Sequence, residues 1–222
     1  MQAFLRKANL FFDLPLTMIS RLLIIGSVLI LIVTYVTPLW NMAFYSNQYT
    51  DGLVLNIYTY KLEGGMSPNR NDLQEINSLN HYIGMRPLLE SDFSEFTWLP
   101  FVIGALMLLA LRAVVIGRMS NLVDVVVLFT YFGLFSLWSF YHRLYTYGHN
   151  LDPTAAIKVE PFTPPVFGEK VIANFTVESY PDVAAYALTA FFILLVAAVL
   201  FSWRRPIPVR SSVGDEELGY AK

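Results

Sequence analysis

Four long apolar stretches constrain this chain more than any other feature of its sequence. They lie at residues 22–40, 98–117, 121–141 and 182–203, and few charged side chains interrupt them. A helix needs about 20 apolar residues to cross a bilayer, where its backbone polar groups must be satisfied internally. The composition agrees, because 55% of the residues are hydrophobic and 14% are charged, against about 25% charged in soluble domains. We therefore predict a mainly α-helical membrane protein with four transmembrane helices.

The distribution of lysine and arginine between these stretches predicts the orientation. Nine of the 15 Lys and Arg residues lie in the N-terminal arm 1–21, around the short link between the second and third stretches, and in the tail 204–222. Basic flanking segments stay in the cytoplasm. We therefore expect both termini to be cytoplasmic in a bacterial inner membrane, with segments 41–97 and 142–181 in the periplasm. The arm mixes cations with Phe and Leu, which is typical of a short helix on the inner surface.

The two outer segments carry patterns of a small folded domain. Residues 53–60 and 170–180 are rich in β-branched and aromatic residues, so both are predicted strands that could pair with each other. Residues 71–85 have apolar side chains at helical spacing, with Asn71 as a possible N-cap and Pro87 ending the run. Prolines in the second outer segment indicate an extended strap. We expect a small α+β periplasmic cap formed by the two loops.

Composition excludes several classes of function. The chain has no cysteine, which excludes disulfides, iron–sulfur clusters, thiolate metal sites and covalently attached haem c. Its net charge of −2 gives no indication of nucleic acid as a partner. It has no glycine-rich phosphate loop, so no nucleotide is expected, and no serine-hydrolase or zinc-protease motif. The sequence favours a non-catalytic protein, and any metal would bind to His, Met or oxygen ligands.

A histidine and a methionine four residues apart form the first candidate metal site. His81 and Met85 would share one face of the predicted helix 71–85, nearly opposite its apolar face. Imidazole and thioether both suit copper, and a thioether favours Cu(I). His149, and more weakly His142, could complete the site, because both are predicted on the same side of the membrane. The alternative is structural, with His81 hydrogen-bonded inside the cap and Met85 packed under a loop.

Aromatic and histidine side chains crowd where the third stretch is expected to leave the membrane. His142, Tyr145, Tyr147 and His149 all fall within this short segment. One interpretation is a metal site or a quinone-headgroup site. The other is an interfacial belt of aromatic residues, which is common in membrane proteins.

Two strings in the outer segments resemble a group of uncharacterised bacterial membrane proteins. They are LNHYIGM at 79–85 and YGHNLDP at 147–153, and the shorter strings PPVFG and IANF that follow are similar too. The resemblance covers both outer segments, about half of the chain. It implies an association with copper handling and with nitrous-oxide-reductase neighbourhoods in bacteria, and it brings no activity. His81, Met85 and His149 lie inside the shared strings.

Three hypotheses follow for the function. The first is a copper-binding accessory protein for a periplasmic or membrane metalloenzyme. The second is a structural subunit of a larger respiratory or photosynthetic membrane complex, in which the chain contacts the lipid bilayer and other membrane or periplasmic subunits. The third is a membrane enzyme with a metal or quinone site at the outer interface, near His142 and His149.

Overall fold

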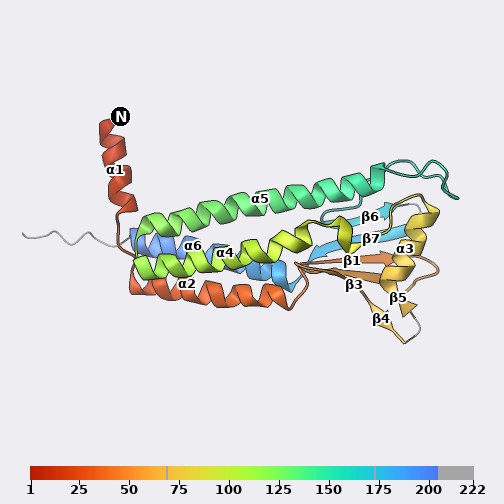
Figure 1. The fold of residues 1–222 in the computed structure, drawn as a ribbon, viewed down its shortest axis with the longest axis horizontal. Helices are drawn as coiled ribbons and strands as arrows, with labels where there is room; N and C mark the ends of the chain where they lie inside the picture. The colour runs from red at the N-terminus through yellow and green to blue at the C-terminus, as the bar shows by residue number, and fades with distance from the viewer. Residues whose placement is uncertain (69, 173, 205–222) are drawn as a thin grey trace, which may run out of the picture.

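The computed structural model describes residues 1–68, 70–172 and 174–204. The predicted cytoplasmic tail beyond Arg204 lies outside this part of the chain. The molecule is elongated, with helices side by side along most of its length and a β-sheet at one end (Figure 1). The prediction of four membrane-length helices joined to a small domain with strands is confirmed. The helices are long and apolar enough to cross a bilayer, which indicates a multi-pass membrane protein.

Four helical elements form the bundle. They are α2 (Met18–Leu31) continued by the 3-10 helix η1 (Ile32–Tyr35), α4 (Glu95–Ile116), α5 (Met119–His149) and α6 (Val183–Trp203). Their common core consists of large aliphatic and aromatic side chains such as Ile24, Leu106 and Phe191, all fully buried. Small polar residues join α2 to α6, because the Ser20 hydroxyl donates to the Ala198 carbonyl over 2.8 Å. Small residues at helix contacts allow this close approach.

The first apolar stretch ends earlier than the sequence predicts. Its helix stops at Tyr35, whereas the predicted span continued to Trp40. Pro38 lacks a backbone N–H, and Trp40 begins strand β1 (Trp40–Tyr45). The third stretch shows the opposite difference, because α5 continues past residue 141 to His149. The end of α5 therefore lies beside the sheet (Figure 1).

One five-stranded antiparallel sheet joins the two outer segments. Its order is β3-β2-β1-β7-β6. The other strands are β2 (Leu53–Ile57), β3 (Leu62–Gly64), β6 (Gly168–Ile172) and β7 (Phe175–Pro181), and a separate pair is formed by β4 (Met66–Ser67) and β5 (Arg70–Asn71). The predicted direct pairing of 53–60 with 170–180 is wrong, because β1 lies between β2 and β7 and pairs with both. The predicted strand 170–180 corresponds to two strands, β6 and β7, which pair with each other in antiparallel orientation.

Helix α3 (Asp72–Tyr82) packs on this sheet and begins as predicted. The Asn71 side chain accepts hydrogen bonds from the N–H groups of Leu73 and Gln74. The helix ends at Tyr82, before the predicted end at residue 85. Gly84 has φ +79°, and the Met85 N–H returns to the Asn80 carbonyl over 2.8 Å. This Schellman motif, and not Pro87, ends the helix.

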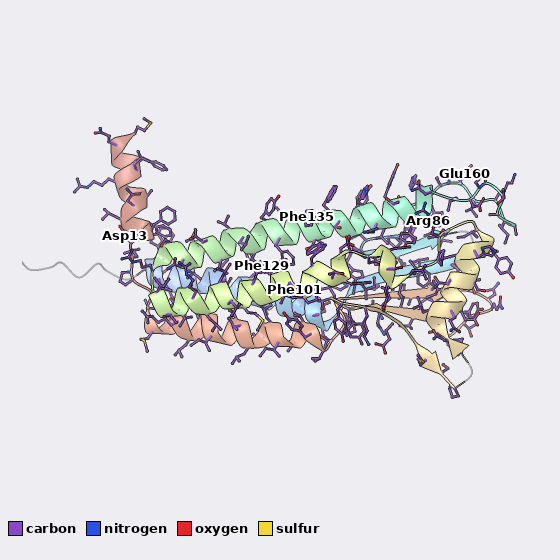
Figure 2. The ribbon with its side chains drawn as sticks, viewed as in Figure 1. Asp13, Arg86, Phe101, Phe129, Phe135 and Glu160 are labelled. Carbon is purple, nitrogen blue, oxygen red and sulfur yellow. The ribbon has the colours of Figure 1, made fainter. Side chains whose placement is uncertain are left out.

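Helix α1 (Gln2–Phe12) corresponds to the predicted N-terminal arm. It lies at the end of the bundle opposite the sheet and runs across the direction of the other helices (Figure 1). Asp13 marks its junction with the bundle, far from Arg86 and Glu160 at the sheet end (Figure 2). The short 3-10 helix η2 (Glu90–Asp92) precedes α4.

Candidate functional site

Two segments far apart in the sequence meet beside the end of α5. The N–H of Asp152 donates to the Gly84 carbonyl over 2.8 Å, and the N–H of Ile157 donates to the Tyr82 carbonyl over 2.9 Å. The last turn of α3 is therefore fixed against the loop that follows α5. The residues that these hydrogen bonds join line an open surface pocket, which is called the hollow below.

Two glycines permit the close approach of these segments. A Cβ on Gly84 would lie 2.8 Å from the Asp152 carbonyl oxygen, and the positive φ of Gly84 also disfavours other residues. A Cβ on Gly148, near the end of α5, would overlap the Phe162 carbonyl oxygen. Phe162 belongs to the proline-rich strap, and its N–H donates to the Gly148 carbonyl over 3.0 Å. The strap is thereby held against α5.

The hollow contains three of the four predicted metal ligands. Its volume is about 880 Å³, and its lining includes His81, Met85 and His149. Met85 reaches it from the turn after α3 and not from a helical face shared with His81, so the geometric reason given for this pair was wrong. The weaker candidate, His142, is outside the lining. Its ring stacks on Trp138 with centroids 5.4 Å apart, as expected of an interfacial aromatic belt.

His149 is oriented by its own helix. Its Nδ1 lies 2.9 Å from the Tyr145 carbonyl oxygen, and its ring stacks on the Tyr145 ring at 3.8 Å between centroids. A carbonyl oxygen only accepts hydrogen bonds, so this contact requires the proton on Nδ1, and in the neutral ring the lone pair is then on Nε2. Histidines that bind metals commonly have this arrangement, in which a backbone carbonyl fixes the tautomer and the direction of the ring.

Asp152 adds negative charge to the hollow, and the sequence reasoning did not single it out. Its Oδ1 accepts hydrogen bonds from the hydroxyl and the N–H of Thr154, over 2.6 Å and 2.8 Å. These two hydrogen bonds, with the one from the hydroxyl contributing most, lower the pKa of Asp152 below its ordinary value. The carboxylate is therefore ionised at neutral pH. The only available signal was its place in the string YGHNLDP.

The ligand types restrict which metal could bind. Among the described residues, no three His, Asp or Glu side chains lie in an arrangement that could hold a metal ion. The donors of the hollow are two imidazoles, one thioether and one carboxylate that is already hydrogen-bonded. A hard cation such as Mg²⁺ or Ca²⁺ prefers several oxygen ligands, whereas imidazole with thioether suits copper, and Cu(I) in particular.

An ion pair between α4 and α5 is the second polar feature near the sheet. The Arg143 guanidinium donates to both carboxylate oxygens of Glu95, over 3.0 Å and 3.2 Å, and the Ser139 hydroxyl donates to Glu95 over 2.7 Å. A bidentate ion pair of this kind fixes the relative position of the two helices. Glu95 has no local sequence signal, because its partner lies on another helix and no short-range pattern connects the two residues.

No known protein family, curated protein or solved structure matches the chain. The resemblance of the two strings to a bacterial membrane protein group therefore stays a prediction.

Proposed function

We propose that this membrane protein binds copper, as Cu(I), through His81, Met85 and His149. One observation carries the proposal: three side chains with soft or borderline donor atoms, from two distant segments, line one hollow. Because Nδ1 of His149 contacts the Tyr145 carbonyl, Nε2 is the ring nitrogen that remains to bind a metal. The carboxylate of Asp152 favours a cation in the same hollow.

The charge distribution supports a periplasmic site. Arg6, Lys7, Arg21, Arg112 and Arg118 belong to α1 and to the bundle end that lies away from the sheet (Figure 1). By the positive-inside rule this end is cytoplasmic, so the sheet and the hollow are on the outer side of a bacterial inner membrane.

An accessory role fits the architecture of the site better than catalysis. The hollow is open, and Met85 lies on an irregular segment rather than within a helix. Both properties suit an ion that must be accepted and released. We therefore propose that the chain holds copper for a periplasmic or membrane metalloenzyme, and that it has no reaction of its own.

The test is the copper content of protein extracted from membranes in mild detergent and loaded with Cu(I). We expect about one copper per chain in the wild type, and loss of this copper in His81→Ala. His142→Ala is the matched control, because this third histidine lies outside the hollow. Equal copper content in wild type and His81→Ala would contradict the proposal.

A second candidate function is that of a structural subunit in a larger membrane complex. The observation that favours it is the exposure of large apolar side chains on the sheet domain. Val171 of the edge strand β6 is 70% exposed, and the exposed rings of Phe167 and Tyr180 pack together at the other end of that strand, beyond the Glu169–Glu178 pair. Exposed apolar side chains along an edge strand are typical of protein contacts.

Gentle extraction tests this second candidate. It predicts a fixed set of partner chains that co-purify with the wild type and are lost with Val171→Lys. Met66→Lys is the control, because Met66 is equally exposed but lies on the separate strand β4. Recovery of the wild type as a monodisperse monomer would contradict the subunit role.

A further inference from the structure

A large apolar cavity lies where the bundle meets the sheet. Its volume is about 670 Å³, and its walls come from α4, α5 and α6 on one side and from β1, β2 and α3 on the other. Pockets for small organic molecules have about this size, roughly 300–1,000 Å³. The cavity is separate from the hollow of the proposed copper site, although Tyr82 and Met85 contribute to both.

Ser136 on α5 places an unused hydrogen-bond donor in this wall. Its hydroxyl oxygen is buried and has no hydrogen-bond partner among the described residues. A serine or threonine in a helix commonly returns its hydroxyl to a carbonyl one turn earlier, as Thr130 of the same helix does to Val126 over 2.8 Å. A buried hydroxyl without a partner is unfavourable, and a bound acceptor would remove this penalty.

Gly133 provides free space one turn before Ser136. A Cβ added at Gly133 would meet no other atom within 4 Å, and Gly133 lines the cavity. The space beside Ser136 is therefore not filled by neighbouring side chains.

The charges in the wall favour an uncharged ligand. Among the described lining residues, the charged ones are Glu95 and Arg143, and these two form an ion pair with each other. A charged ligand group would find no unpaired counter-charge here and would lose its hydration. The remaining wall is mainly aliphatic and aromatic, which suits a long hydrocarbon chain.

We propose that this cavity binds one membrane amphiphile, with a long apolar chain and an uncharged head that carries an oxygen acceptor. The Ser136 hydroxyl donates to that oxygen, and the chain occupies the space between α4, α5 and α6. The bilayer is the source, because Leu137 and Thr189 line the cavity and are also exposed on the surfaces of two membrane-length helices.

Two of the four tryptophans provide a direct measurement. Trp40 and Trp98 line the cavity, whereas Trp138 and Trp203 do not. In a Trp138→Phe/Trp203→Phe background, the full chain is placed in phosphatidylcholine vesicles and titrated with dibrominated octadecanol, which quenches nearby tryptophans. We expect saturable quenching. Quenching that only rises in proportion to the mole fraction of the probe would overturn the proposal.

Matched variants test the place of binding. Gly133→Leu fills the cavity and is expected to weaken octadecanol binding by about tenfold or more. Gly26→Leu is its control, since Gly26 of α2 also has no atom within 4 Å but lies outside the cavity. Equal binding by these two variants, both folded by circular dichroism, would overturn the proposal.

Ser136→Ala and a charged probe test the head group. Loss of one hydrogen bond predicts binding about threefold to tenfold weaker in Ser136→Ala, and unchanged binding in Thr130→Ala. Dibrominated octadecanoate, which carries a carboxylate at pH 8, should bind more weakly than the alcohol. Octadecanoate that binds as tightly as the alcohol, or Ser136→Ala that binds as tightly as its parent, would overturn the assigned head group.

Discussion

Asp152 donates its backbone N–H to the carbonyl of Gly84 over 2.8 Å, and this contact joins the end of α3 to the loop after α5. Together with the hydrogen bond from the Ile157 N–H to the Tyr82 carbonyl, it fixes His81 and Met85 relative to the loop that follows His149. The contact joins backbone atoms and requires that Gly84 has no Cβ, so any substitution at Gly84 should disrupt it.

Gly84→Ala is therefore expected to disturb both stability and the proposed site. Alanine at φ +79° is strained, and its Cβ would press on the Asp152 carbonyl. We expect a loss of about 1–3 kcal/mol in the free energy of unfolding, together with weaker Cu(I) binding. Pulse proteolysis in denaturant measures the first quantity. Gly26→Ala in α2 should cost nothing, because the helix there has room for a Cβ. Wild-type stability in Gly84→Ala would contradict the argument.

Met85→Leu tests the thioether as a ligand. Leucine keeps the apolar volume with little loss of packing but has no donor atom. We expect Cu(I) affinity to fall by about tenfold or more, measured by competition with a chromogenic Cu(I) chelator. Met66→Leu, on a strand away from the hollow, should leave the affinity unchanged. If both variants bind like the wild type, Met85 is not a ligand.

The contributions of Glu95 and Arg143 to the free energy of unfolding should be strongly coupled, because the two side chains form an ion pair. Replacing Arg143 by Met leaves a carboxylate that is mostly buried, with a side-chain exposure of 19%. We expect a loss of about 1–3 kcal/mol in the free energy of unfolding, and partial recovery when Glu95→Gln is added.

The pair between Lys61 and Glu63 is the comparison, because both of its side chains are more exposed. Lys61→Met should lower the free energy of unfolding much less than Arg143→Met, because solvent screens an exposed pair. A double-mutant cycle at Glu95 and Arg143 with no coupling energy would contradict the structural role of that pair.

The hydrogen bond between Tyr49 and Glu75 is expected to make a pH-dependent contribution to the stability of the sheet domain. Its hydroxyl donates to Glu75 over 2.8 Å, and this hydrogen bond, followed by burial, raises the pKa of Tyr49 above its ordinary value. A raised folded-state pKa means that the stabilisation is complete below about pH 10 and is lost as the pH rises through the folded-state pKa.

We therefore expect Tyr49→Phe to lower the free energy of unfolding by about 0.5–1 kcal/mol at neutral pH. The difference from the wild type should disappear at strongly alkaline pH, when denaturant unfolding is measured at both pH values. Tyr131→Phe is the control, because Tyr131 is 71% exposed. A difference that grows with pH would contradict the assignment.

Local sequence signals account for the elements that depend on few neighbours. The side chain of Asn71 caps α3 through N–H groups only two and three residues away. The four membrane-length helices follow from hydropathy, because a helix satisfies its own backbone. Gly84 is itself a local signal for the end of α3, whereas the predicted helix continues through it to residue 85, with Pro87 as the expected stop.

Long-range contacts decided the rest. The aromatic residues of β1 fitted a membrane-interface belt equally well, and strand structure arose there because β2 and β7 supply hydrogen bonds on both sides. Asp152 and Glu95 acquired their surroundings from distant segments, as did the cavity at Ser136. The sequence by itself determined which segments are apolar enough to span a bilayer and which donor atoms are available for a metal. Only the tertiary structure decided that His81, Met85 and His149 share one hollow, because hydropathy and spacing act over a few residues whereas packing joins segments anywhere in the chain.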